Sequence, residues 1–365
     1  MYRGQRVGIV VPAYNESQLI GAVIETIPDF IDRIYVFNDR STDHTWDVIQ
    51  ASAATANAAI ASEAGYDERV VPMNNPRNVG VGGCVKQGYA LALADGLDIV
   101  ARMDGDGQMD PTQLPRMLDP IVDDVADFVK GNRLWYKEYR EGMSRWRVFG
   151  NSILTGLTKV ASGYWKMVDP QNGYSAISIE ALKTIPFEEL YEGYGFENDL
   201  LVMLNVYDQR LAEVAHPSIY GDEVSDIHYS TFVPHLSYIL LRTFLWRLKM
   251  KFFVYDFHPA VFGYIFGLFG LLVGVVAAVL TIRDVLAGVA MMADVMLTIT
   301  MFWLSALLLI LAVSADVERN AHLVVLVHHK PGEGRGDHAM EPVPRSVSSP
   351  TDSSPTLEPN RRDMQ

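Results

Sequence analysis

The amino-acid sequence predicts an α/β fold with a mostly parallel β-sheet, helices on both faces of that sheet, and a C-terminal hairpin of two transmembrane helices. Three observations predict it. Short apolar runs alternate with segments of helical periodicity along the first 230 of the 365 residues, which is typical of parallel sheets. Polar clusters follow these runs, at the ends of the expected strands. Two long apolar stretches without charged residues lie in the C-terminal third.

The expected strands are continuous apolar runs, the pattern of strands buried on both faces. They cover residues 6–14, 31–39, 69–74, 98–104 and 126–133. The expected helices between them cover residues 15–27, 41–64 and 78–96. Because the ligands of such sheets bind at the carboxyl ends of the strands, we expect the polar clusters there to form one site.

Composition limits the classes of protein to consider. The formal net charge of −14 argues against nucleic acid as a partner, because nucleic-acid-binding domains carry a basic surface. A single cysteine, Cys84, excludes an internal disulfide and a multi-cysteine metal site, in line with a cytoplasmic catalytic domain. The N-terminal sequence lacks the longer apolar core of a signal peptide.

The two apolar stretches predict membrane spans at about 260–282 and 293–315. The first has no charged residue in 23 positions, and as a helix it is about 34 Å long, enough to cross the hydrocarbon core. The short link between the spans places both ends of the hairpin on one side of the membrane. The alternative is a buried helix pair of a soluble protein. Four basic residues precede the first span, and the positive-inside rule places the catalytic domain and both termini in the cytoplasm. They are Arg242, Arg247, Lys249 and Lys251.

The segments around the spans differ in composition. Residues 234–253 mix aromatic, leucine and basic side chains, which suits a helix in the membrane interface with its bases toward lipid head groups. An ordinary amphipathic packing helix is the alternative. The C-terminal residues are rich in proline, serine, glycine and charge, and a disordered tail is expected. The expected domains are 1–230 (catalytic), 231–257 (interfacial helix and linker), 258–318 (transmembrane hairpin) and 331–365 (tail).

The sequence DGDGQMDP places two carboxylates after the fourth expected strand. Asp104 and Asp106 are separated only by Gly105, so they repel each other unless a cation lies between them. Mg²⁺ and Mn²⁺ prefer oxygen ligands, and Mg²⁺ commonly combines one or two carboxylates with substrate phosphates. An acidic surface loop is the alternative. The position at a strand end favours a site for a metal ion and a diphosphate.

Four motifs, in this order and spacing, resemble family 2 glycosyltransferases: VVPAYNES, NDRSTDHT, NVGVGGCVKQGYALA and DGDGQMDP. The downstream DPQNGYSAIS and GYGFENDLL, with the membrane hairpin, resemble the dolichyl-phosphate mannose synthase branch of polyprenyl-phosphate glycosyltransferases. The resemblance covers about residues 5–230 by motif. It implies a Rossmann-like GT-A fold, a UDP- or GDP-linked sugar donor, a polyprenyl phosphate acceptor and Mg²⁺ or Mn²⁺ as cofactor.

The resemblance also assigns a donor site. Asp104, Asp106 and Gln108 correspond to the metal motif. The residues expected to bind the nucleotide-sugar are Pro12, Tyr14, Glu16, Phe37, Asp39, Asp104 and Gln108. The sequence departs from the usual D-D-G-S-T-D at Asn38 and Arg40, which leaves the nucleotide open. For Tyr14 and Asn38, the alternative is that they are simple turn residues without a role in binding. The glycines of NVGVGG are not a P-loop, and close backbone packing is favoured over a phosphate site.

Acceptor-side residues follow from the same resemblance. Arg133 and Arg145 are expected to bind the acceptor phosphate, with solvated arginines as the alternative. Glu197 and Asp199 match an acidic pair that lies by the acceptor, with a helix cap as the alternative. One of them would be a general base for a hydroxyl acceptor. A lipid phosphate is already ionised, and the acid would then orient the acceptor or bind sugar hydroxyls. The expected catalytic residues are Asp104, Asp106, Arg133, Glu197 and Asp199.

The implied reaction is a metal-dependent, inverting transfer by one in-line displacement. Extension of a lipid-linked saccharide or polysaccharide is an enzymatic alternative. The Q-x-x-R-W motif of processive synthases is missing, since Arg145-Trp146 precedes the acidic pair and has Gly142 in place of the glutamine. An inactive membrane scaffold with the same fold is the alternative of another class, and the intact acidic motif argues against it. The sugar, the nucleotide and the length of the lipid stay open.

Overall fold

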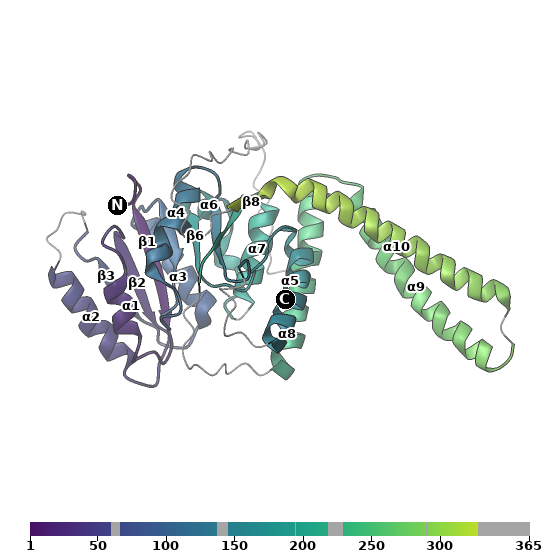
Figure 1. Ribbon diagram of the computed structural model, residues 1–365, viewed down its shortest axis with the longest axis horizontal. Coiled ribbons are helices and arrows are strands. Elements are labelled where there is room, and N and C mark those ends of the chain that lie inside the picture. Colours follow the sequence, from purple (N-terminus) through teal and green to yellow (C-terminus); the bar gives the residue numbers. More distant parts are fainter. Residues whose placement is uncertain (60–65, 137–144, 194, 218–228, 290, 328–365) are drawn as a thin grey trace.

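The computed structural model describes the chain except residues 60–65, 137–144, 194, 218–228, 290 and 328–365. Figure 1 shows an α/β domain from which a long helical hairpin extends. The expected tail, 331–365, lies outside the described residues.

One eight-stranded sheet forms the centre of the α/β domain, in the order β3-β2-β1-β4-β6-β5-β7-β8. β6 is antiparallel to β4 and β5, and the other pairings are parallel. The strands are β1 (Val7–Ala13), β2 (Arg33–Asn38), β3 (Val70–Asn74), β4 (Ile99–Arg102), β5 (Phe128–Asn132), β6 (Ser175–Ser178), β7 (Leu211–Ala215) and β8 (Val324–Val327). The mostly parallel sheet and the first five strands confirm the prediction. The apolar pattern does not predict β6, β7 and β8; β6 (SAIS) begins and ends with serine and β7 carries a buried glutamate, so neither is a continuous apolar run.

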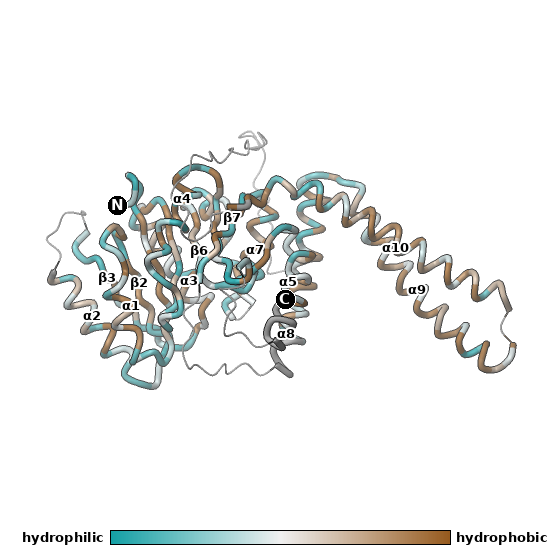
Figure 2. Tube along the Cα trace, viewed as in Figure 1, coloured by the Kyte–Doolittle hydropathy of each residue, from teal (hydrophilic) through white to brown (hydrophobic). Residues whose placement is uncertain are grey.

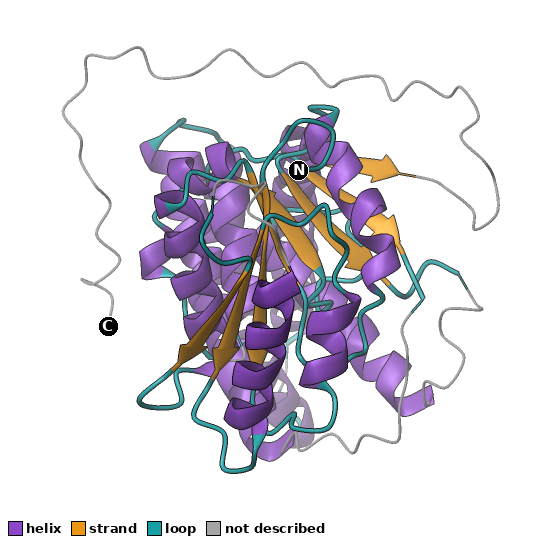
Figure 3. Ribbon diagram, turned by 90° about the vertical axis from the view of Figure 1, so that its left-hand side faces the viewer, coloured by secondary structure: helices purple, strands orange, loops and turns teal. Residues whose placement is uncertain are grey.

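Helices cover both faces of the sheet, because the side chains of a strand alternate between its faces. In β1, Ile9 and Val11 point into a core with α1, α2 and α4, whereas Val10 points into a second core with α3, α6 and α7. The helices are α1 (Ile20–Thr26), α2 (Thr45–Ala59), α3 (Gly80–Ala94), α4 (Leu114–Val122), α5 (Arg145–Ser162), α6 (Ile179–Thr184) and α7 (Phe196–Val206). Figure 3 shows the sheet edge-on among these helices.

The hairpin consists of α9 (Ala260–Leu286) and α10 (Met292–Asn320), both long and apolar enough to cross a membrane. Figure 2 shows that most residues along both helices are hydrophobic. Only 17% of the apolar window of each helix is buried, which does not fit a helix pair inside a soluble core. Glycines bring the two helices together, since a Cβ on Gly267 would lie 2.7 Å from Leu309 Cγ. These helices are the expected candidate membrane spans.

A further helix, α8 (Tyr229–Lys249), and a π-helical turn, Met250–Val254, precede the hairpin. α8 packs on α5 and α7. The prediction that the basic residues of 234–253 face lipid head groups is wrong for Arg247 of α8 and Lys251 of the π-helical turn. These two residues are 0% and 2% exposed. Both side chains instead bind oxygen atoms of the protein, because the hairpin joins the α/β domain there.

The chain returns to the sheet after the hairpin. β8 follows α10 and pairs in parallel with β7, with Leu211 opposite Val324. The hairpin is therefore attached to the α/β domain at both of its ends, through α8 before α9 and through β8 after α10.

Candidate active site

The carboxyl ends of β1, β2 and β4 bring three polar clusters of the sequence to one edge of the sheet. The main-chain nitrogen of Asp39 donates to the carbonyl of Ala13, and that of Gly105 donates to the carbonyl of Pro12 at 3.0 Å. The segments after the three strands are therefore held side by side. This arrangement is the one that parallel topology predicts.

Glycine allows the acidic turn after β4 to lie against β1. A Cβ on Gly105 would come 3.0 Å from both Ala13 Cβ and Ile20 Cδ1, so a larger residue would push the turn away. Asp106 Oδ1 accepts a hydrogen bond from the main-chain nitrogen of Gln108 at 2.9 Å. Asp104 and Asp106 are both half-buried and within reach of a ligand at this edge.

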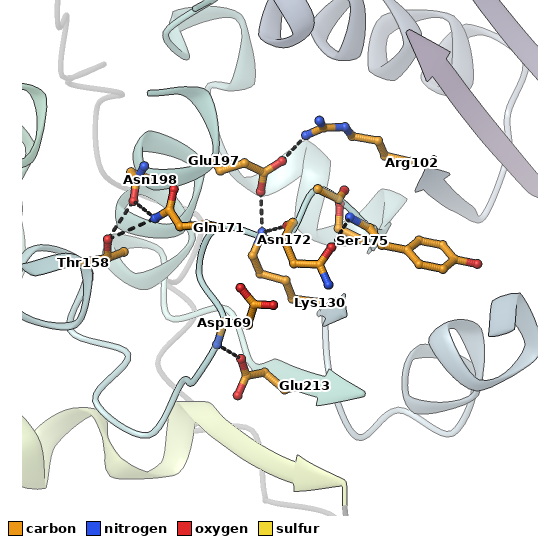
Figure 4. Close-up of polar contacts among 12 residues, drawn as sticks. Arg102, Lys130, Thr158, Asp169, Gln171, Asn172, Ser175, Glu197, Asn198 and Glu213 are labelled. Atoms are coloured by element: carbon orange, nitrogen blue, oxygen red, sulfur yellow. Dashed lines mark hydrogen bonds and ion pairs between the residues drawn. The ribbon is translucent and has the colours of Figure 1, made fainter. Parts of the chain in front are cut away.

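A buried arginine connects the acidic turn to α7. Arg102 Nε donates to Asp104 Oδ1 at 2.9 Å, and its Nη1 donates to Glu197 Oε1. Lys130 Nζ donates to the second oxygen of Glu197 at 2.6 Å. Figure 4 shows Glu197 between Arg102 and Lys130. Arg102 and Lys130 are 5% and 0% exposed, so both cations lie inside the protein, whereas Asp104 at the other end of the chain of charges is half-buried.

Sequence reasoning missed Arg102 and Lys130. Each is the single charged residue of a fully buried strand, Arg102 in β4 and Lys130 in β5. A charge in a buried strand indicates that a partner must exist, because buried charges need partners. The sequence does not show which residue that partner is. Glu197 is separated from them by 95 and 67 positions.

The predicted acceptor-side acids both lie in the first turn of α7 and are both buried. Asp199 Oδ2 accepts from the main-chain nitrogen of Tyr191 at 2.9 Å. Glu197 accepts from two cationic side chains, so its carboxylate acts here as their shared counter-charge. The structure thus brings Glu197, and not Asp199, into direct connection with the acidic turn.

Arg133, at the end of β5, forms a two-pronged ion pair with Asp169. Its Nε lies 2.8 Å from Asp169 Oδ2 and its Nη2 lies 3.1 Å from Oδ1. Burial raises the pKa of Asp169, but the charge and hydrogen bonds of Arg133 outweigh it and hold this pKa below its usual value. The guanidinium is thereby fixed in orientation at the carboxyl edge of the sheet. Arg145 is the first residue of α5, and its side chain lies outside the described residues.

The Asp39 carboxylate is directed inward. It is 4% exposed and accepts from the main-chain nitrogens of Val79 and Gly80, both at 2.8 Å, at the start of α3. The glycines of this helix start also pack closely, because a Cβ on Gly82 would lie 2.7 Å from the carbonyls of Tyr191 and Glu192. This geometry agrees with the packing interpretation of NVGVGG, and it joins the donor-side segment to the loop before α7.

The remaining residues predicted to bind the nucleotide-sugar differ in exposure. Tyr14 is 49% exposed and Glu16 is half-buried, both just after β1. Pro12 is buried and offers its carbonyl to Gly105. Phe37 is fully buried within the core on the α3 face of the sheet, so contact of its side chain with a nucleotide is not supported.

A buried histidine lies behind the site, after β7. His216 Nδ1 donates to the carbonyl of Pro217 at 2.8 Å, and its Nε2 accepts from Asn172 Nδ2 at 2.7 Å, which fixes the neutral tautomer. Burial lowers the pKa of His216 to about 4. Because this pKa lies below the ordinary value of 6.5, the unfolded chain takes up the proton first as the pH falls. The stability that neutral His216 contributes is complete above about pH 6.5 and is lost toward pH 4.

His216→Gln is therefore expected to reduce the loss of unfolding free energy between pH 6.5 and pH 4 by up to about 3 kcal/mol, and so to flatten the fall of the melting temperature over this range. Glutamine still accepts from Asn172 but does not titrate. Melting curves at half-unit pH intervals measure the slope. His44→Gln is the control, because the His44 side chain is 88% exposed. Equal slopes in the parent and in His216→Gln would contradict the assignment.

Comparison with known proteins defines the class. Residues 8–185 match the family described as glycosyl transferase family 2. The chain belongs to this family, and its mostly parallel sheet with helices on both faces has the expected GT-A architecture.

Characterised relatives are similar over most of their own length. The UDP-N-acetylglucosamine–dolichyl-phosphate N-acetylglucosaminyltransferase of Methanococcus voltae is 26% identical over 216 residues, 59% of this chain and 86% of the relative. The undecaprenyl-phosphate mannosyltransferase of Micrococcus luteus is 26% identical over 224 residues, 57% of this chain and 82% of the relative. A glucosyl-3-phosphoglycerate synthase from Mycobacterium tuberculosis, solved with Mn²⁺, UDP and glucosyl-3-phosphoglycerate, is 21% identical, with a TM-score of 0.45 over 68% of this chain and 81% of that one.

Proposed function

We propose that this protein transfers a sugar from a nucleoside-diphosphate donor to the phosphate of a polyprenyl lipid at the cytoplasmic surface of a membrane. One observation carries the proposal. The acidic turn at the carboxyl edge of the sheet is joined through Arg102 to Glu197 of α7, in a domain that carries a hairpin of two candidate membrane spans. The relatives that act on dolichyl and undecaprenyl phosphates support this class of acceptor.

The acidic turn fits a divalent metal ion that is shared with the donor. Asp104, Asp106 and Gln108 offer oxygen atoms, the ligands that Mg²⁺ and Mn²⁺ prefer. Among the described residues, no three His, Cys, Asp or Glu side chains are grouped to hold a metal ion. Diphosphate oxygens and water would therefore complete the ligand shell. The bound ion would neutralise the negative charge of the departing nucleoside diphosphate.

The reaction we propose needs no strong base. A phosphate oxygen of the lipid attacks the anomeric carbon of the sugar as the bond to the nucleoside diphosphate breaks, with inversion at that carbon. The acceptor is already ionised, so Glu197 can remain the counter-charge of Arg102 and Lys130. We assign Arg133, oriented by Asp169, and Arg145 to the acceptor phosphate, and Tyr14 and Glu16 to the donor.

A hydroxyl acceptor on a lipid-linked saccharide and a scaffold without activity remain the alternatives. The experiment that separates them incubates membranes holding the full chain with labelled UDP- and GDP-sugars, Mn²⁺ and polyprenyl phosphate. Label that extracts into chloroform on the lipid phosphate is the expected result. Label in an aqueous polymer or on a longer lipid-linked saccharide, or no transfer at all, would overturn the proposal.

Exposed apolar side chains on α5 and α8 support a position in the membrane interface. Outside the segment from α8 to α10, three of the six exposed large apolar side chains among the described residues lie on α5, including Ile153 and Leu157 at 52% and 48% exposed. α8 adds Tyr238 and Leu241 at 61% and 57%. In Figure 1 both helices lie at the end of the domain from which the hairpin extends. Such surfaces suit the boundary between lipid and water.

A spin label on Leu157→Cys is expected to be more accessible to oxygen, which concentrates in lipid, than to a water-soluble nickel chelate. The reason is that Leu157 faces the bilayer in our proposal. Power-saturation EPR of the full chain in lipid nanodiscs measures both accessibilities. A label at Ala54→Cys, at an exposed position of α2, is the control and should show the reverse order. Greater accessibility of position 157 to the nickel chelate would place α5 in water.

A further inference from the structure

The hairpin meets the α/β domain at two buried polar clusters. The first is centred on an ion pair between Arg247 of α8 and Asp316 of α10, both 0% exposed. Arg247 Nη1 and Nη2 each lie 2.8 Å from a different oxygen of Asp316. Its Nε and Nη2 also donate to the carbonyls of Ala161 and Val160, at the end of α5. One guanidinium thus joins three helices.

Asp316 is bound from further sides. Trp165 Nε1 and Tyr264 of α9 both donate to Asp316 Oδ2 at 3.3 Å, and Asn320 Nδ2 donates to Oδ1 at 2.8 Å. A Cβ on Gly163 would lie 2.6 Å from Arg247 Nη1, so the chain after α5 closes over the guanidinium. The ion pair is accordingly the meeting point of the α/β domain with both hairpin helices.

The second cluster fastens α7 to the same place. Lys251 Nζ donates to the carbonyl of Asn205 and to Asn320 Oδ1, both at 2.8 Å. Asn205 Nδ2 also donates to Asn320 Oδ1 at 3.0 Å. Asn205 lies near the C-terminal end of α7, whose first turn carries Glu197. The helix that holds the acceptor-side acid is therefore bound directly to the end of the second candidate span.

Stability alone does not explain such groups. Apolar side chains of similar volume often stabilise a junction as well as, or better than, a buried ion pair. A buried ion pair does impose one geometry, because any shift leaves charges unpaired inside the protein. Contacts between apolar helices fix the relative position of the helices less strictly, because a small shift leaves no charge unpaired and costs little free energy.

We propose that Arg247 and Asp316, with Lys251, Asn205 and Asn320, are positioning residues that hold the active site at one height and tilt above the membrane, where the lipid phosphate lies. The hairpin is then part of the acceptor site's geometry and more than an anchor. The part of this inference that concerns the lipid phosphate rests on the proposed function. The rigidity of the junction does not, and it can be tested without measuring activity.

The test uses the full chain with the double substitution R247M/D316L, which replaces the ion pair by apolar side chains. Transfer to a long polyprenyl phosphate in nanodiscs is expected to lose between about tenfold and about a hundredfold in kcat/KM, since misplacement by about 1 Å costs up to about 10²-fold. Transfer to a water-soluble phosphate with two isoprene units, which reaches the site from solution, is expected to stay unchanged. Equal losses with both acceptors, or no loss with either, would overturn the proposal.

A second measurement follows the junction directly. Spin labels on Thr184→Cys of α6 and Leu304→Cys of α10 report the distance between domain and hairpin, because Cys84 is buried and stays unlabelled. R247M/D316L is expected to broaden the distance distribution. A distribution as narrow as that of the parent would overturn the proposal, whatever the activity. If the parent transfers sugar to neither acceptor, the proposed function fails, whereas the distance measurement still decides on the junction.

The control is Asp256→Asn, which removes a more exposed ion pair between the link before α9 and Arg319 of α10. It is expected to change neither the distance distribution nor the ratio of the two acceptors. Should R247M/D316L not fold, Arg247→Lys carries the same two measurements. It keeps the charge but loses the two-pronged contact, and parental values in both measurements would overturn the proposal.

Discussion

Replacement of Asp106 by alanine is expected to abolish sugar transfer while the fold remains. Asp106 is half-buried in the turn between Gly105 and Gly107, and its side chain accepts a hydrogen bond from the main-chain nitrogen of Gln108 in that turn. In the function proposed here it is a principal oxygen ligand of the metal ion, so its loss removes the charge stabilisation of the leaving diphosphate. A drop in kcat of at least about 10³-fold is expected, comparable with the loss of a principal electrostatic group in other active sites. Initial rates at saturating Mn²⁺ measure it.

A readout besides activity separates metal binding from folding. Mn²⁺ with UDP or GDP is expected to raise the melting temperature of the parent but not that of Asp106→Ala, because ligands stabilise only a protein that binds them. Asp110→Asn is the matched control, since Asp110 lies in the same loop and its carboxylate caps the next turn. Full activity in Asp106→Ala, or an undiminished shift with Mn²⁺ and nucleotide, would refute the metal assignment.

Replacement of Arg102 by methionine is expected to be the second severe change, because it affects both stability and the site. Arg102 is buried between two carboxylates, Asp104 and Glu197, and its removal leaves them without their shared counter-charge. Breaking one side of a buried ion pair costs about 3–5 kcal/mol of unfolding free energy. Denaturant titration of the detergent-solubilised chain measures this loss.

Activity is expected to fall as well, by about 10²-fold, because Asp104 and α7 lose their fixed relation. Glu192→Gln is the control: its carboxylate forms an ion pair with Lys86 but is 52% exposed. Exposed pairs contribute about 1 kcal/mol or less. Parental stability and activity in Arg102→Met would show that Asp104 and Glu197 do not depend on each other.

Local sequence patterns were sufficient for much of the fold and for part of the site. The position of the acidic turn at the carboxyl edge of the sheet could be predicted because it follows directly after an apolar strand of a parallel sheet. The candidate spans could be predicted because length and lack of charge are local properties. The pairing of Arg102 and Lys130 with Glu197 could not, since it depends on which strands and helices become neighbours in space.

The basic residues before the hairpin show the same limit. Their composition suggested lipid head groups, yet Arg247 and Lys251 have protein partners 69 positions further along the chain, in α10. Composition shows that charged residues are present, but it does not show whether their side chains contact lipid, water or protein. Phe37 is a similar case, since an aromatic residue at a strand end gives no sign of which face of the sheet it joins.

The last strand also has a consequence for biosynthesis. A ribosome releases β8 only after both apolar helices have been made, so the hydrogen-bonding groups along β7 have no β8 neighbour while the hairpin is being synthesised. Open strand edges are where nascent chains associate wrongly. The sheet is thereby completed only after the whole hairpin has been synthesised, and until then β7 is an open edge at which wrong association can begin.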